Sequence, residues 1–254
     1  MEYRKGSGMV NTVKDIRTAF IDMYRDKDIQ PDGNIEIIGA SFLATEPTIF
    51  GKPNREYQEA EVRWYDTLSL NLRELKKEYG KVPVIWKEHA ANSKGDINSN
   101  YGYLVYSALN GTQYEYVLQE LKQNPKSRRA TMVYTNPSMH TQYREHGKND
   151  FVCTNAVTYY IKGTLIHAVV QMRSNDAVFG YINDLFWQRT VLRRLCKDLG
   201  YEPGQIVWQA QSLHVYPRHF HLIDLPDDFR TYDKVPVDYE LEEMGAYDIG
   251  AYDD

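Results

Sequence analysis

The sequence has little of what marks a secreted, membrane-spanning or nucleic-acid-coating protein. Two cysteines, Cys153 and Cys196, are too few for a disulfide framework or a zinc cluster, and they favour a reduced, cytoplasmic setting. No apolar run approaches the length of a membrane span, and the first residues lack the apolar core of a signal peptide. The net charge of −5 argues against general nucleic-acid binding, which needs a basic surface. The histidines show no spacing typical of a metal site, so we expect none.

What remains is the composition of an ordinary globular protein. Its 254 residues are 42% apolar and 26% charged, which is enough to bury a core. The 21 tyrosines favour half-buried sites and interfaces, because each joins an apolar ring to a polar tip. We expect one domain over residues 1–230, followed by an acidic tail, 231–254, that could dock other enzymes of nucleotide synthesis.

Apolar periodicity predicts a mixture of helices and strands without strict alternation, which favours an α+β fold over a doubly wound sheet. Expected helices cover 12–26, 55–77, a stretch around 114–121, and 175–199, which ends at Gly200. Expected strands cover 35–44, 130–135, 152–162, 164–173 and 205–216, with a tight hairpin at Lys162-Gly163-Thr164.

Several polar residues in these elements are candidates for chemistry. Cys153 opens an apolar strand, where a cysteine is either a small buried hydrophobe or, with positive charge nearby, a nucleophile. Arg128 and Arg129 lie at the start of one strand, and Arg173-Ser174 lies at the end of another. These residues are either solvated strand ends or, together, a binding site for a phosphate.

Two further candidates depend on which face of their element they occupy. Glu61 shares the expected face of its helix with Tyr57, Trp64 and Leu68. It is either an edge residue that reaches water or a buried carboxyl whose raised pKa suits proton transfer near neutral pH. His214 and Tyr216 alternate on one strand and therefore share a face.

Taken together, these segments resemble the thymidylate synthase family, and within it the deoxycytidylate (dCMP) hydroxymethylase branch of phages. The segments that carry the resemblance are IEIIGASF, EVRWY, INSNYG, NPKSRR, DFVCTN, VVQMRSNDAVFGYIND and SLHVYPRH. They follow one another from residue 34 to residue 221. The resemblance implies an α+β fold with a mixed sheet flanked by helices, and a homodimer that packs sheet against sheet.

The resemblance also implies roles for individual positions. Cys153 matches the nucleophile and Glu61 the glutamate that organises water and protons. Arg173 and Ser174 would bind the nucleotide phosphate, and Arg128 and Arg129 would reach the partner's phosphate across the dimer interface. His214 and Tyr216 would bind the deoxyribose hydroxyl. The residues that would line the folate pocket are Trp86, Tyr101, Asp176 and Gly180.

The sequence departs from thymidylate synthases in three places. Thr154 stands where they carry a histidine after the nucleophile, and no arginine near 31–34 matches their early phosphate ligand. An acidic tail replaces their short apolar C-terminal lid. The first two departures resemble the hydroxymethylase branch. The third means that this sequence has no segment that matches the C-terminal lid of thymidylate synthases.

Asp184 bears on the choice of base. In thymidylate synthases the matching residue is asparagine, which complements the carbonyl and N3–H of uracil. A carboxylic acid that shares one proton complements the amino group and bare N3 of cytosine, and as a carboxylate it would repel O4 of uracil. Outside this motif, Asp184 would be a solvated helix residue.

The expected reaction is therefore hydroxymethylation of dCMP with 5,10-methylenetetrahydrofolate and water, through addition of Cys153 to C6. Glu61 and Asp184 are the candidates for positioning the water. Two alternatives stay open at this point: a dCMP methylase or thymidylate synthase variant that captures hydride, and a scaffold or RNA-binding regulator on the same fold.

Overall fold

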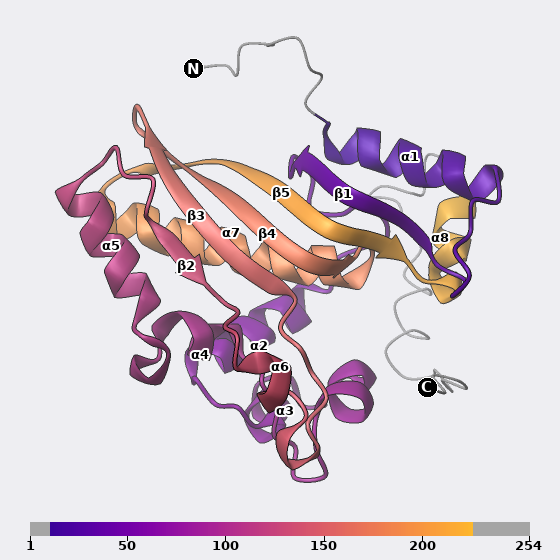
Figure 1. Ribbon diagram of the computed structural model, residues 1–254, viewed down its shortest axis with the longest axis horizontal. Coiled ribbons are helices and arrows are strands. Elements are labelled where there is room, and N and C mark those ends of the chain that lie inside the picture. The colour runs from indigo at the N-terminus through magenta and orange to yellow at the C-terminus, as the bar shows by residue number, and fades with distance from the viewer. Residues whose placement is uncertain (1–10, 226–254) are drawn as a thin grey trace.

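A five-stranded mixed sheet forms the centre of the chain, in the order β1-β5-β4-β3-β2 (Figure 1). The computed structural model describes residues 11–225, so the expected boundary at residue 230 and the acidic tail lie outside the described residues. The strands are β1 (Ile35–Leu43), β2 (Thr131–Val133), β3 (Thr154–Lys162), β4 (Leu165–Asp176) and β5 (Glu202–Val215). Only β4 and β5 pair in parallel. The predicted α+β class is confirmed.

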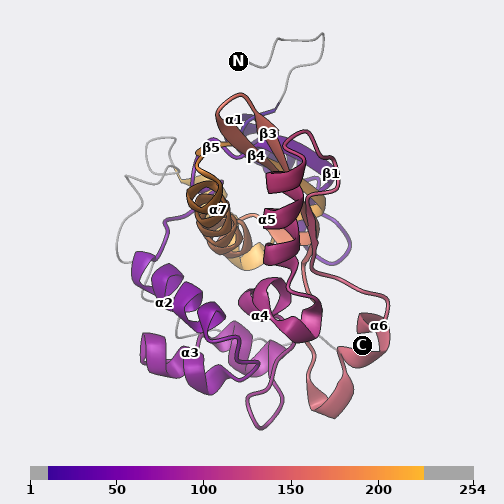
Figure 2. The same ribbon diagram turned by 90° about the vertical axis from the view of Figure 1, so that its left-hand side faces the viewer.

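Helices cover one side of this sheet and extend beyond its edge. The longer helices are α1 (Val13–Arg25), α2 (Arg55–Asp66), α3 (Leu72–Tyr79), α5 (Gln113–Gln123) and α7 (Phe179–Leu199). The short ones are η1 (Ile85–Ala90, a π-helix), α4 (Tyr101–Tyr106), η2 (Ala108–Asn110), α6 (Met139–Gln142), η3 (Glu145–Gly147), η4 (Pro217–His219) and α8 (Phe220–Asp224). Helix α7 crosses behind the sheet, and α2, α3 and α4 lie below it (Figures 1 and 2). None of the helices in residues 11–225 has the length and apolarity needed to cross a membrane.

The β3–β4 hairpin is formed as the sequence predicts, with Gly163 at a positive φ of 62° in its turn. Helix α7 provides the crossover from β4 to the parallel strand β5, and it ends at Gly200, whose φ is +74°. The expected helix at 175–199 starts too early, because β4 extends through Asp176 and α7 begins only at Phe179.

The single helix expected over 55–77 is wrong. The chain leaves α2 after Asp66, and Leu68 adopts a left-handed conformation with a φ of 56°. The side chain of Asn71 then caps α3 by accepting a hydrogen bond from the Arg73 amide. Leu68 therefore does not continue the face of Tyr57 and Glu61, and the apolar periodicity alone did not reveal the break.

The sheet changes its buried face part of the way along its central strands. In β5 the buried residues run through Ala210 and then Leu213, and in β4 through Met172 and then Asn175. The β3–β4 pair has a register shift between Thr154 and Ala156, opposite Met172 and Gln171, just before the change of face. Asn175 faces α7, where it donates a hydrogen bond to Asp184, although the preceding pattern places odd-numbered residues of β4 on the other side.

Candidate active site

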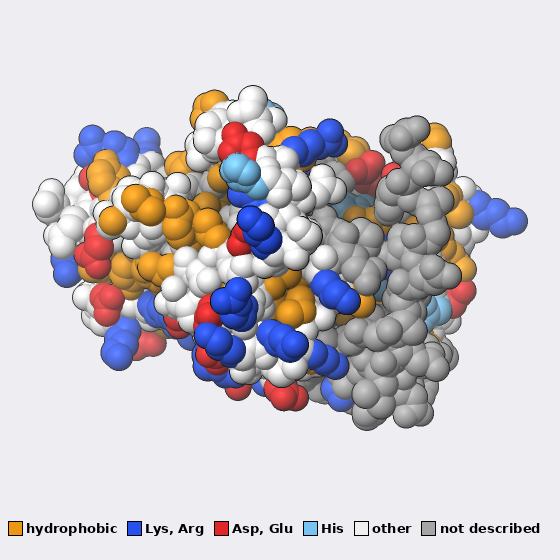
Figure 3. Space-filling model, turned by 90° about the horizontal axis from the view of Figure 1, so that it is seen from below, with side chains coloured by type: hydrophobic (Ala, Val, Ile, Leu, Met, Phe, Trp, Pro, Cys, Tyr) orange, Lys and Arg blue, Asp and Glu red, His pale blue; other side chains and the backbone are white. Residues whose placement is uncertain are grey.

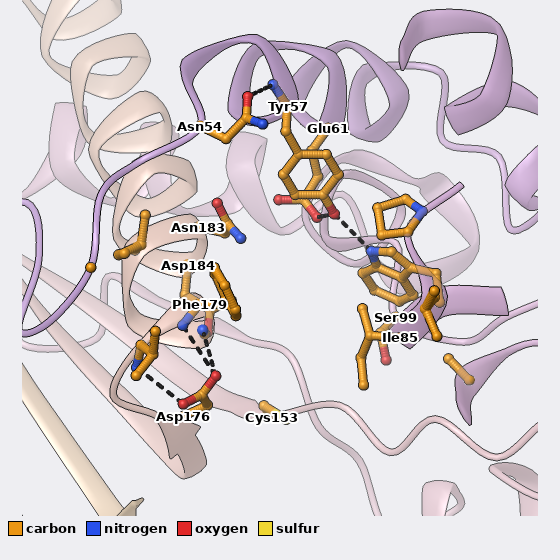
Figure 4. A pocket seen from close by; sticks show the side chains of 18 of the residues that line it. Asn54, Tyr57, Glu61, Ile85, Ser99, Cys153, Asp176, Phe179, Asn183 and Asp184 are labelled. Carbon is orange, nitrogen blue, oxygen red and sulfur yellow. Dashed lines mark hydrogen bonds between the residues drawn. The ribbon is translucent and has the colours of Figure 1, made fainter. Parts of the chain in front are cut away.

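A cavity of about 470 Å³ lies where α2, η1, α4 and the start of α7 meet the ends of the strands. This volume is within the range of small-molecule sites. Eight of the thirteen predicted site residues line it: Glu61, Trp86, Tyr101, Cys153, Asp176, Gly180, Asp184 and Tyr216. Figure 4 shows Asp176, Phe179, Asn183 and Asp184 along one side of the cavity and Ile85 and Ser99 along another. Folding thus gathers residues that are more than 150 positions apart in the sequence.

Cys153 lies just before β3 and lines the cavity. Its sulfur is 3.7 Å from a guanidinium nitrogen of Arg173. Burial raises the pKa of the thiol to about 11, while the positive charge of Arg173 acts to lower it. Arg173 thus supplies positive charge in contact with this cysteine.

Arg173 is held in place by the segment that carries the cysteine. Its Nε donates to the carbonyl of Val152 and its Nη2 to the carbonyl of Phe151, at 3.0 and 2.8 Å. The guanidinium carbon also lies 4.9 Å from the centre of the Phe151 ring. The side chain is therefore fixed beside Cys153.

Glu61 is buried, with 6% of its surface exposed, at the centre of an aromatic cluster. Tyr57 donates a hydrogen bond to its Oε1 at 2.6 Å, and the indole N–H of Trp86 donates to the Tyr57 hydroxyl at 2.8 Å. Burial raises the pKa of Glu61 to about 7, and hydrogen bonds from Tyr57, Tyr65 and Trp86 partly oppose that rise. Glu61 can therefore gain or lose a proton near neutral pH.

Asp184 lies on α7 and accepts a hydrogen bond from Asn175 at 2.8 Å. Burial, and then the nearby charge of Glu61, raise its pKa well above the usual range of a carboxyl. Hydrogen bonding from Asn175 and Tyr101 opposes the rise without cancelling it. Burial therefore favours the protonated carboxylic acid form of Asp184, which can donate a hydrogen bond as well as accept one.

Asp176 ends β4 and organises the start of α7. Its carboxylate accepts hydrogen bonds from the backbone N–H groups of Val178, Phe179 and Gly180, at 3.0, 3.1 and 3.4 Å. A side chain at Gly180 would crowd this corner of the cavity, because its Cβ would lie 3.1 Å from the Asn175 amide nitrogen and 3.2 Å from the Asp176 Cβ.

His214 and Tyr216 lie together, as their alternation predicts, with ring centroids 4.8 Å apart in an edge-to-face arrangement. Tyr216 lines the cavity, whereas His214 packs behind it. His214 is 7% exposed, and burial lowers its pKa, so its imidazole is neutral at pH 7.

The remaining predicted residues lie outside the cavity lining of the single chain. Arg128 and Arg129 precede β2 at the sheet edge, and Arg129 forms an ion pair with Glu120 at 3.2 Å. Ser174 pairs with Ser212 in the sheet. The predicted role of the two arginines across a dimer interface stays a prediction.

Several residues of the site were not predicted from the sequence. Asp150 accepts hydrogen bonds from the backbone N–H groups of Asn98 and Ser99 and so ties the segment before α4 to the segment before Cys153. Lys52 and Arg218 add positive charge to the cavity wall. Nothing in their local sequence patterns marks these residues, because their neighbours come from distant parts of the chain. Within residues 11–225, no cluster of three or more His, Cys, Asp or Glu could hold a metal ion.

Comparisons with known proteins identify the class to which this fold and site belong. The family model for thymidylate synthase matches residues 54–235, and the chain belongs to that family. Thermostable thymidylate synthase A from Bacillus subtilis superimposes with a TM-score of 0.63 at 22% identity, covering 84% of each chain.

Relatives by sequence divide between two branches. Deoxycytidylate 5-hydroxymethyltransferase of Enterobacteria phage T4 is 48% identical over 224 residues, which is 84% of this chain and 89% of that protein. Thymidylate synthase of Bacillus mojavensis is 30% identical over 196 residues, 74% of this chain and 67% of that protein. The predicted family resemblance is confirmed.

Proposed function

We propose that this chain is a deoxycytidylate 5-hydroxymethyltransferase. It converts dCMP, 5,10-methylenetetrahydrofolate and water to 5-hydroxymethyl-dCMP and tetrahydrofolate. The 48% identity to the phage T4 enzyme supports dCMP hydroxymethylation. The observation that carries the proposal is Asp184, a buried carboxyl whose pKa is raised by burial and which lines the same cavity as Cys153.

Asp184 supplies the contact to the base. Its proton bridges to N3 of cytosine, and its other oxygen accepts from the amino group at C4. The hydrogen bond to N3 draws electrons from the ring and makes C6 more electrophilic. The same carboxyl therefore serves both binding and activation.

Cys153 is the nucleophile. With a thiol pKa of about 11, only a small fraction is thiolate at neutral pH, so the thiol loses its proton to water as it attacks the bound base. The sulfur forms a bond to C6, the ring electrons move toward N3, and C5 becomes nucleophilic. The Arg173 guanidinium, 3.7 Å from the sulfur, stabilises negative charge there before attack and when the thiolate leaves at the end.

The cavity has the features that a folate requires. Ile85, Trp86 and Phe179 provide apolar surface on which a flat pterin can pack. Asp176 accepts three backbone hydrogen bonds, and a carboxylate has about four acceptor positions, which leaves one for a pterin donor. When bound, methylenetetrahydrofolate supplies the one-carbon unit that becomes attached to C5.

Glu61 holds the water whose oxygen becomes the product hydroxyl. A carboxyl with a pKa of about 7 accepts a proton from this water at neutral pH and releases it to solvent before the next cycle. The hydrogen bonds from Tyr57 and, through it, Trp86 keep the carboxyl in one orientation. Capture of water rather than hydride distinguishes this reaction from thymidylate synthesis.

A homodimer would complete the nucleotide site. The sheet face opposite α7 has no helix in front of it in Figure 1, and it exposes apolar side chains such as Ile38 (74%) and Val133 (46%). We place the partner's sheet there, so that Arg128 and Arg129 of each chain reach the phosphate of the nucleotide bound by the other. Arg173 and Ser174 would contact that phosphate from the same chain, and His214 and Tyr216 the deoxyribose hydroxyl. Sedimentation should give twice the 29.7 kDa chain mass.

The site needs a free thiol, which fits a reducing cytoplasm, including that of a phage-infected bacterium. Figure 3 shows basic and acidic side chains interspersed on the face seen from below, where a general nucleic-acid binder would gather basic ones. The net charge of −5 likewise fits a free nucleotide as substrate rather than a polynucleotide.

Incubation of the full chain with methylenetetrahydrofolate and equal amounts of dCMP and dUMP, followed by mass spectrometry, tests the proposal. We expect a hydroxymethyl product on dCMP alone, and none with the Cys153→Ser variant, which should still bind dCMP. A methyl product, or product on dUMP, would overturn the assignment of branch. A wild-type protein that forms no nucleotide product would favour a scaffold.

A further inference from the structure

Asn175 connects the base-reading carboxyl to the protein core. It is 3% exposed at the end of β4, and its Nδ2 donates to Oδ2 of Asp184 at 2.8 Å. Its Oδ1 in turn accepts from the indole N–H of Trp208 at 3.1 Å. Trp208 is fully buried, and an indole nitrogen is only a donor, so the amide oxygen must face Trp208 and the NH₂ must face Asp184.

This chain of hydrogen bonds addresses an ambiguity in the choice of base. A neutral carboxylic acid has one O–H donor and one carbonyl acceptor, and either oxygen can carry the proton. It complements cytosine when the proton is on the oxygen that faces N3. It complements uracil equally well when the proton is on the other oxygen, because uracil presents N3–H and a carbonyl at C4. Protonation of Asp184 alone therefore does not exclude dUMP.

The Asn175 amide makes the two oxygens of Asp184 unequal. An N–H donor bonds more strongly to the carbonyl oxygen of an acid than to its hydroxyl oxygen, so the bond to Oδ2 favours the proton on Oδ1. Glycine at position 180 leaves space for the Asn175 amide, because a Cβ there would lie 3.1 Å from the amide nitrogen and would push it away. Moving that amide would break one or both of its bonds.

We propose that Asn175, held by Trp208, is a specificity-determining positioning residue that fixes the proton of Asp184 on the oxygen facing N3. Oδ2 then faces the substituent at C4, where it accepts from the amino group of cytosine and repels O4 of uracil. Asn175 touches neither the substrate nor the reacting atoms and acts through Asp184. The inference rests on the proposed function, because it presumes that the cavity binds dCMP.

Binding of both nucleotides to Asn175→Leu tests the inference. Leucine keeps the approximate volume of asparagine but removes the amide, and Trp208→Phe keeps an aromatic ring but removes the indole donor. Titration calorimetry of the full chain with dCMP and with dUMP, without folate, gives the ratio of the two affinities. Thermal melts establish that each variant is folded.

We expect Asn175→Leu to reduce the preference for dCMP over dUMP by about tenfold or more, since each well-placed contact to a base edge contributes about that much discrimination. Trp208→Phe should shift the ratio in the same direction by a smaller factor. An equal loss of affinity for both nucleotides, or an unchanged ratio in a folded Asn175→Leu variant, would overturn the inference. A wild-type protein without a preference for dCMP would instead refute the proposed function.

Discussion

The buried carboxyl of Glu61 should make the stability of the protein depend on pH in a specific way. Its pKa is about 7 in the folded chain against 4.5 when free, so the folded state binds the proton more tightly than the unfolded state. Stability from this group is fully present below pH 4.5 and is lost as the pH rises through 7. Between pH 5 and pH 8 the linkage amounts to about 2.5 kcal/mol of unfolding free energy.

Glu61→Gln removes this dependence while keeping an oxygen that accepts from Tyr57. The free energy of unfolding of the variant minus that of the wild type should therefore increase by about 2.5 kcal/mol from pH 5 to pH 8. Urea denaturation at both pH values measures it, with protein concentration held constant because association also stabilises the folded state. The same variant should lose turnover, because Gln cannot accept the proton of water.

Glu59→Gln is the matched control. Glu59 lies on the same helix with a half-exposed side chain that pairs with Arg55 at 2.9 Å. Its variant should follow the pH dependence of the wild type. If the difference between Glu61→Gln and the wild type is the same at pH 5 and pH 8, the argument that burial raises the pKa of Glu61 is wrong.

Three further predictions concern the site and its support. The rate of alkylation of Cys153 by iodoacetamide in the free enzyme should rise with pH up to about pH 11. Arg173→Gln should move the midpoint of this pH profile higher, because the positive charge beside the thiol is lost. A wild-type midpoint below pH 8 would contradict the effect of burial. Asp184→Asn should shift the ratio of kcat/KM for dCMP over dUMP toward dUMP by at least ~10²-fold, and an unchanged ratio would refute its contact with the base. Gly102→Ala should destabilise the fold by ~3 kcal/mol or more in urea denaturation, because the added Cβ would lie 1.9 Å from the Tyr65 carbonyl oxygen; near-wild-type stability would show that α4 can move away from α2.

Local pattern alone was sufficient to predict most of the strands. The alternation in 152–162 and 164–173, together with Gly163 between them, predicts the β3–β4 hairpin that the structure contains. Such patterns succeed because alternation and turn chemistry act between residues that are near in sequence. The single helix expected over 55–77 was wrong because the second helix begins at Asn71, whose side chain also contacts the more distant Asp96.

Sequence by itself determined the family, the set of chemical groups and the presence of a carboxyl at position 184. Only the tertiary structure decided the states of those groups. Burial among residues from α2, α4 and α7 raises the pKa values of Glu61 and Asp184, and the reversal of faces in β4 aims Asn175 at Asp184. Desolvation and the orientation of a hydrogen bond depend on which distant segments enclose a side chain, and no local pattern of residues encodes that enclosure.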